Sequence, residues 1–168
     1  MKRTTLLSSI VCFFISTISF AQDITGVITK SKNHTTLITA LNAADLTIIL
    51  QGDGPFTVFA PTDTAFDKLP AGTVAKLLKP ENKTQLSSIL TYHVIPGNLM
   101  ATDVIAAIKQ GGGSLQVETL HGTILIATLN NNKVVLTDAS GTTAIVTATN
   151  LKGSNGVIHV IDTVLMPE

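Results

Sequence analysis

The second half of the chain alternates short apolar and threonine-rich runs with glycine and asparagine turns at a spacing of roughly ten residues, and this pattern limits the fold most. The runs with strand composition are residues 115–119, 123–129, 134–137, 143–149 and 157–166. Such a series predicts antiparallel hairpins packed as a sandwich or as a curled sheet.

The last of these runs is apolar on both alternating faces, which is typical of a strand with neighbours on both sides. One face carries Ile158, Val160 and Val164. The other carries Val157, Ile161 and Leu165, with His159 between the first two. We therefore expect a central strand here, with His159 buried and hydrogen-bonded to a partner.

The first half of the chain has helical periodicity instead. Across residues 23–51, apolar residues recur every three to four positions, and they are Leu37, Leu41, Ala44 and Ile48. Two or three short helices are expected there, then a strand over residues 56–59. Further helices are expected from Thr62 or Asp63 to Pro70 and over residues 73–78, 81–91 and 102–109. Helices first and strands later predict an α+β fold, with the helices against one part of the sheet.

The N-terminal residues have the pattern of a secretory signal peptide. Lys2 and Arg3 precede an apolar stretch that ends in a small-residue cleavage pattern at Ala21. This predicts a signal peptide over residues 1–21 and a secreted, extracellular or periplasmic mature protein that starts near Gln22. An alternative is a lipoprotein acylated at Cys12, but Cys12 lies inside the apolar run and follows Ile10 and Val11 rather than small residues. The rest of the chain, residues 22–168, shows no repeat or linker and is expected to form a single domain.

Charge and motif content limit the function. The chain has 11 basic and 11 acidic residues without a basic run, which argues against nucleic-acid binding or an anionic membrane surface. It lacks the common zinc-protease, thiol-redox, hydrolase and nucleotide-binding motifs. The four histidines share no metal-ligand spacing, and we expect neither metal nor cofactor. The sequons at Asn33 and Asn82 would matter only in a glycosylating host.

Three segments together resemble fasciclin domains: GPFTVFAPTDTAF at residues 54–66, YHVIPG at residues 92–97 and NGVIHVID at residues 155–162. The resemblance extends over essentially all of residues 22–168 and implies a single fasciclin domain, a wedge-like β-sandwich packed with helices. It also implies an adhesion module rather than an enzyme, which mediates cell–cell, cell–matrix or host-surface contact by binding a protein or glycan.

The residues that carry the resemblance have physical roles of their own. A buried strand that turns sharply into a helix calls for Pro61 to fix φ and for Thr62 or Asp63 to cap the helix. Phe59 and Phe66 are expected to supply large core contacts, and Gly156 to permit the backbone geometry that leads into the last strand. The full set of signature residues is Phe59, Pro61, Thr62, Asp63, Phe66, Asn155, Gly156, His159 and Asp162.

The resemblance also suggests where a partner would bind. In animal members, segments around the Tyr-His pair and around an Asp-Ile pair are implicated in receptor binding. Here Tyr92 and His93 match the first pair, whereas Asn150 and Leu151 stand at the second, where the missing carboxylate argues against integrin-type recognition. A structural alternative for Tyr92 and His93 is a half-buried hydrogen-bonding role at a helix-to-strand junction.

Charged residues are scattered singly, so recognition is expected to rest on an apolar or neutral polar patch. Leu99 and Met100 follow a turn and extend the candidate surface around Tyr92, although they could instead pack under the following helix. The alternative function is an extracellular binder of a small apolar ligand such as a carotenoid. Against it, only four aromatic residues remain after residue 21, and they are Phe56, Phe59, Phe66 and Tyr92.

Overall fold

The computed structural model describes residues 22–167, so the predicted signal peptide lies outside the described residues. Its helices are α1 (Ile24–Thr29), α2 (Thr35–Ala43), α3 (Thr47–Leu50), α4 (Asp63–Asp67), α5 (Thr73–Leu77), the 3₁₀ helix η1 (Pro80–Asn82), α6 (Lys83–Tyr92) and α7 (Ala101–Gln110). Its strands are β1 (Phe56–Pro61), β2 (Val94–Pro96), β3 (Ser114–Glu118), β4 (Ile124–Asn130), β5 (Lys133–Thr137), β6 (Thr143–Gly153) and β7 (Gly156–Ile161). The predicted α+β class is confirmed.

The strands form one seven-stranded sheet in the order β2-β1-β7-β6-β5-β4-β3. β1 and β7 are parallel, and every other neighbouring pair is antiparallel. The two edges approach each other where the Leu120 amide, after β3, donates a 2.6 Å hydrogen bond to the Val94 carbonyl of β2. The sheet is therefore nearly closed like a barrel.

Of the two predicted arrangements, a sandwich or a curled sheet, the structure has the single curled sheet rather than a wedge-like sandwich as such, and β6 is the reason. This 11-residue strand pairs with β5 through its first residues and with β7 along the rest. Its register against β7 shifts between Val146 and Ala148 and again between Ala148 and Leu151. Such irregularities bend a strand, so one long strand continues from one part of the sheet into the other.

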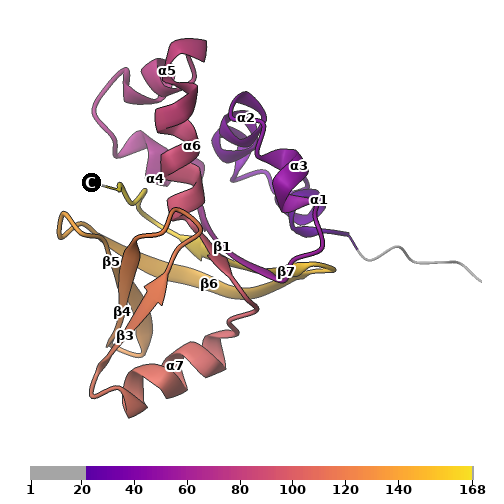
Figure 1. Ribbon diagram of the computed structural model, residues 1–168. Coiled ribbons are helices and arrows are strands. Elements are labelled where there is room, and N and C mark those ends of the chain that lie inside the picture. The colour runs from indigo at the N-terminus through magenta and orange to yellow at the C-terminus, as the bar shows by residue number, and fades with distance from the viewer. Residues whose placement is uncertain (1–21, 168) are drawn as a thin grey trace, which may run out of the picture.

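Helices cover the sheet on two sides (Figure 1). α1 to α6 gather over one face of β1 and β7, whereas α7 lies on the other side. Residues of β1 alternate between the two cores: Val58 and Ala60 belong to the helical core, and Phe59 faces the second core with Val104 and Ile108 of α7. Phe59 and Phe66 are both buried, which confirms their expected core roles.

The first-half periodicity was partly misleading. Three helices occupy the region, as predicted, but α2 ends at Ala43 and Asp45 takes a left-handed conformation with φ 57°. This break rotates the next turn, so Ile48 is 76% exposed while Leu46 and Leu50 are buried. The prediction that Ile48 shares the buried face of Leu37 and Leu41 is therefore wrong.

The predicted central strand is confirmed as β7, which lies between β1 and β6. It ends at Ile161 rather than at residue 166. Val164 and Leu165 are nevertheless buried, because two side chains hold the backbone that follows the strand. The Leu165 amide donates to Nε2 of His93, and the Met166 amide donates to Oδ2 of Asp138.

Candidate functional site

Asn155, the first residue of the segment NGVIHVID, joins three parts of the chain through its side chain. Its Oδ1 accepts a 2.9 Å hydrogen bond from the Ile24 amide at the start of α1. Its Nδ2 donates to the carbonyls of Leu50, at 2.7 Å, and Gly52, at 2.9 Å. Only a side chain with both an acceptor and a two-proton donor satisfies all three groups. Asn155 thus fixes the turn before β1 against α1.

The next residue, Gly156, lies where the backbones of β1 and β7 come very close together. A Cβ at Gly156 would lie 2.0 Å from the carbonyl oxygen of Phe56. At Gly54, which has φ 54°, a Cβ would lie 2.2 Å from the Asn155 carbonyl oxygen. Both positions therefore require glycine, which confirms the expected backbone role of Gly156 and explains it by close approach.

The first signature segment caps two helices. Thr62 caps α4, with its Oγ1 accepting from the Ala65 amide at 3.3 Å, so Thr62 rather than Asp63 is the N-cap. The Asp63 carboxylate instead reaches the start of α2, where it accepts from the amides of Thr35 and Thr36 and from the Thr35 hydroxyl. Burial acts to raise the pKa of Asp63, but these hydrogen bonds outweigh it and lower the pKa. Pro61 is the last residue of β1.

Asp162, the last residue of the segment NGVIHVID, also joins two elements through hydrogen bonds to its carboxylate. Its Oδ1 accepts from the Ile145 amide at 2.8 Å and from the Thr163 hydroxyl at 3.0 Å, and Oδ2 lies 3.5 Å from the Lys68 ammonium. Burial acts to raise the pKa of Asp162, and these hydrogen bonds together with Lys68 lower it. Asp162 therefore anchors β6 beside the end of β7.

Tyr92 and His93 lie in the interior, so the expectation that Tyr92 belongs to an exposed surface is wrong. Tyr92 is completely buried and His93 is 2% exposed. His93 Nδ1 is 2.7 Å from the Ile89 carbonyl, and its Nε2 accepts from the Leu165 amide at 3.1 Å. Burial lowers the pKa of His93 to about 4, against the raising effects of the Ile89 carbonyl and Asp138. The ring is thus neutral, with Nδ1 as the donor. Any partner binding by this pair stays a prediction, and its position favours the structural alternative.

His159 is buried with two partners, as predicted. Its Nε2 lies 2.8 Å from the Leu99 carbonyl, and its Nδ1 faces the Asn150 amide at 3.4 Å. The Phe59 ring packs against it with the centroids 5.6 Å apart. Burial lowers the pKa of His159, and the Leu99 carbonyl acts in the opposite direction. His159 therefore connects the loop before α7 to β6.

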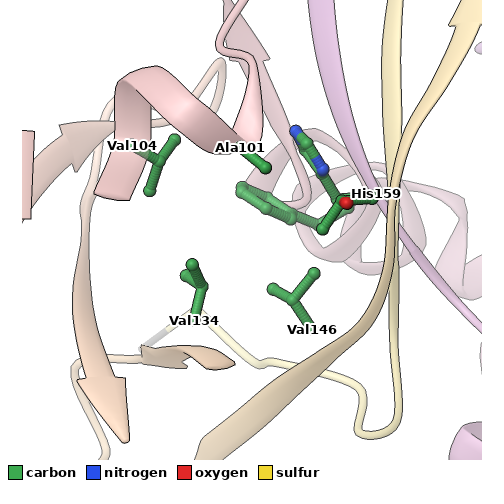
Figure 2. Close-up of a pocket in the computed structure, with 7 residues that line it drawn as sticks. Ala101, Val104, Val134, Val146 and His159 are labelled. Atoms are coloured by element: carbon green, nitrogen blue, oxygen red, sulfur yellow. The ribbon is translucent and has the colours of Figure 1, made fainter. Parts of the chain in front are cut away.

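A small apolar cavity lies beside this histidine (Figure 2). Side chains from α7, β5, β6 and β7 point into it, including those of Val104, Val134, Val146 and His159. Its volume is about 10 Å³, which is about the space of one water molecule. Sites for drug-sized apolar ligands have volumes of about 300–1,000 Å³, so this cavity has no room for a carotenoid.

Asn150 caps α7 from another element, a role that sequence reasoning missed. Its Oδ1 accepts a 2.9 Å hydrogen bond from the Ala101 amide, and its backbone has φ 59°. Asparagine tolerates this left-handed conformation better than most residues do. An asparagine inside a predicted strand region was the one sign in the sequence of a special role. The sequence did not indicate the partner, because the capped helix begins 49 residues earlier. Leu151, next to it, is 41% exposed.

Three loops frame a groove of about 360 Å³ at this end of the sheet. Its lining residues are Asp53, Pro55, Asn98, Met100, Lys152, Gly153, Ser154, Asn155 and Gly156. Met100 is the one predicted partner-binding residue that lines it. Leu99 packs instead against the second core. Four other lining residues, Asp53, Asn98, Lys152 and Ser154, were not predicted from the sequence, although each lies in or beside a turn near one of the three fasciclin-like segments.

Within residues 22–167, no three side chains of His, Cys, Asp or Glu gather in a way that could hold a metal ion. None of the helices in this part of the chain has the length and apolar character needed to cross a membrane.

Comparisons with known proteins agree with this architecture. A solved FAS1 domain pair from the insect cell adhesion molecule Fasciclin I superposes with a TM-score of 0.75 at 20% identity, covering 86% of this chain and 51% of that one. Protein sll1483 of Synechocystis is 46% identical over 147 residues, covering 88% of this chain and 74% of that protein. The cell surface glycolipoprotein MPB83 of Mycobacterium bovis is 37% identical over 160 residues, covering 90% of this chain and 64% of that protein.

The animal relatives are much longer. This chain is 31% identical over 155 residues to the pig transforming growth factor-beta-induced protein ig-h3, with 92% of this chain but only 20% of that protein covered. The family model described as the fasciclin domain matches residues 32–167. Together with the shared fold, this match shows that the chain belongs to the fasciclin domain family.

Proposed function

We propose that this chain is a secreted or surface-exposed adhesion module that binds a protein or glycan through the groove between residues 53–55, 98–100 and 152–156. The observation that carries the proposal is the way the groove is built. On one side of the groove, Asn155 is hydrogen-bonded to the start of α1 and Gly156 lies close against β1. On the other side, Asn150 of β6 is hydrogen-bonded to the Ala101 amide, next to the loop of residues 98–100. A rigid frame that presents variable loops is a common arrangement for recognition.

The composition of the groove favours binding over catalysis. Its nine lining residues include one carboxylate and one ammonium group but no histidine or cysteine. Covalent catalysis by a serine or cysteine commonly uses an adjacent histidine as base. The three most buried histidines instead serve as hydrogen-bonding groups inside the fold. Two similar proteins, one a cell surface glycolipoprotein and the other a cell adhesion molecule, support the same interpretation.

The lining residues also indicate the chemistry of the partner. Asp53 and Lys152 balance in formal charge, while Asn98 and Ser154 offer neutral hydrogen-bonding groups and Met100 offers an adaptable apolar surface. Because the groove has no net charge, long-range electrostatic steering contributes little. Binding should therefore change little with salt concentration.

Replacing Met100 with serine is expected to weaken adhesion about tenfold, the usual order for a well-packed interface residue, with little loss of stability. Met100 is only partly buried and lines the groove. Adhesion of the purified protein to extracellular material from its native host would be measured at low and moderate salt, together with the melting temperature. Leu151→Ser tests the adjoining exposed position in the same assay.

Leu99→Ser is the matched control, because Leu99 packs on the second core and this change should lower the melting temperature instead. Unchanged adhesion of a folded Met100→Ser protein would refute the groove as the binding site. So would adhesion that collapses between low and moderate salt.

Export is a separate expectation of the same proposal. The N-terminal residues predict cleavage after Ala21, so the exported protein should begin at or near Gln22. N-terminal sequencing of protein recovered outside the cytoplasm would check this. Recovered protein that still begins at Met1 would contradict it.

A further inference from the structure

The strands β3 to β6 have an outer face that α7 does not cover. Inward side chains of these strands, such as Leu125, Leu136 and Val146, are buried with Val104 and Ile108 of α7 in the second core. Outward side chains alternate with them and are exposed or only partly buried: Ile124 (50%), Ile126 (38%) and Ile145 (38%) are exposed, whereas Thr128, Val135 and Thr137 are partly buried. We call this surface, made of the outward residues of β3 to β6, the outer β face.

The strand register arranges the outer β face in four rows across the sheet. Two central rows are neutral and consist of Gln116, Ile126, Thr137 and Thr143, followed by Ser114, Thr128, Val135 and Ile145. One end row pairs Glu118 with Ile124, and the opposite end row pairs Lys133 with Asn130. The face is therefore acidic at one end, basic at the other and uncharged between them.

We propose that a second copy of this chain binds the outer β face, which makes a symmetric homodimer. A two-fold axis that lies in the interface and runs across the strands brings the acidic end of one copy over the basic end of the other. The central isoleucine, valine and threonine rows then meet each other. This goes beyond the proposed function, since the groove is lined by different residues.

The charge arrangement favours a second copy over an unrelated partner. A surface is self-complementary in a two-fold dimer only when its opposite charges lie on opposite sides of the axis. Glu118 and Lys133 satisfy this condition. Sheets that pack face to face lie about 10 Å apart with strands crossing at about 30°. Because Glu118 lies on β3 and Lys133 on β5, the strands must cross in the sense that brings β5 of one copy toward β3 of the other, so that these long side chains can meet.

Two carboxylates beside the strands, those of Asp162 and Asp138, do not disturb this arrangement. The Asp162 carboxylate accepts a hydrogen bond from the Ile145 amide, and its Oδ2 lies 3.5 Å from the Lys68 ammonium, so the charges of Asp162 and Lys68 neutralise each other. Asp138, after β5, is 4% exposed and accepts hydrogen bonds from Ser140, Thr142 and Met166. Burial of the neutral rows is therefore the main source of stabilisation, and the end charges set the orientation.

The first test measures mass against concentration by analytical ultracentrifugation. We expect the wild-type protein to pass from monomer to dimer as the concentration rises. Ile126→Lys should raise the dissociation constant at least about tenfold, since it buries an unpaired charge at the centre of the interface. Ile48→Lys, at a more exposed isoleucine on α3, is the matched control and should dimerise normally. A monomeric wild type, or equal dimerisation of both variants, would overturn the proposal.

The second test exchanges the end charges. Glu118→Lys alone and Lys133→Glu alone should each weaken the dimer about tenfold, because each places like charges opposite one another in both symmetry-related pairs. The double variant Glu118→Lys/Lys133→Glu restores opposite charges and should recover the wild-type dissociation constant. If the double variant is as weak as the single ones, or the single variants dimerise normally, the proposed orientation is wrong. Normal dimerisation of Met100→Ser would separate this interface from the groove.

Discussion

Replacing Asn155 with aspartate is expected to lower the free energy of unfolding by about 2 kcal/mol, the order for polar groups left unsatisfied at a half-buried site. The carboxylate could still accept a hydrogen bond from the Ile24 amide. It would, however, face the carbonyl oxygens of Leu50 and Gly52, which now accept from Nδ2 at 2.7 and 2.9 Å. Two attractive contacts would become repulsive without a change in side-chain size.

Chemical denaturation at pH 7 would measure this effect, with Asn98→Asp as the matched control. Asn98 is exposed and lines the same groove, so the control introduces the same charge without opposing the two carbonyls. We expect the control to unfold within about 0.5 kcal/mol of the wild type, as is usual for surface substitutions. If Asn155→Asp were as stable as Asn98→Asp, the assigned role of Asn155 would be wrong.

Acidification from pH 6.5 to pH 4 is expected to cost the fold about 3 kcal/mol through His93 alone. Burial lowers the pKa of His93 from 6.5 to about 4 in the folded protein. Between these values the unfolded chain takes up a proton that the folded protein excludes. The stabilising contribution of His93 is therefore complete above pH 6.5 and is lost as the pH falls toward 4. Protonation would also point an Nε2–H at the Leu165 amide, which needs an acceptor.

Other titrating groups can be separated from His93 by variants. His34 and His159 also have a lowered pKa because of burial, so they add to the wild-type pH dependence in the same direction. Asp63 and Asp162 have a pKa below 3.8, so their contributions are lost only at lower pH. The difference between the wild type and His93→Gln therefore isolates His93.

The measurement is the free energy of unfolding at several pH values between 7 and 4. His93→Gln should be less stable at pH 7 but should lose about 3 kcal/mol less on acidification. His121→Gln, which removes a partly buried histidine that lines a surface groove, is the control for the loss of a histidine ring outside the core. Parallel pH profiles of wild type and His93→Gln would show that the ring titrates normally in the folded state.

The sequence by itself determined the α+β class, the approximate positions of the helices and strands, the central place of β7 and the buried state of His159. These features depend on the pattern of residues within one element and the turns beside it. Apolar periodicity tells which side of a helix or strand faces a core, and glycine and asparagine turns tell where an element ends. The prediction for Ile48 failed because the left-handed conformation of Asp45 interrupts the helical periodicity and leaves Ile48 exposed.

Only the tertiary structure decided how these elements join and which residues form the groove. The bend of β6 makes one nearly closed sheet from strands that could equally have formed two. Asn155 bonds to Ile24 across 131 positions, and Asn150 caps a helix 49 positions away, whereas Tyr92 lies inside the fold. The physical reason is that the sequence around a polar side chain in a turn does not indicate which distant group it will hydrogen-bond. Its role depends on which distant backbone groups the packed cores bring within hydrogen-bonding distance.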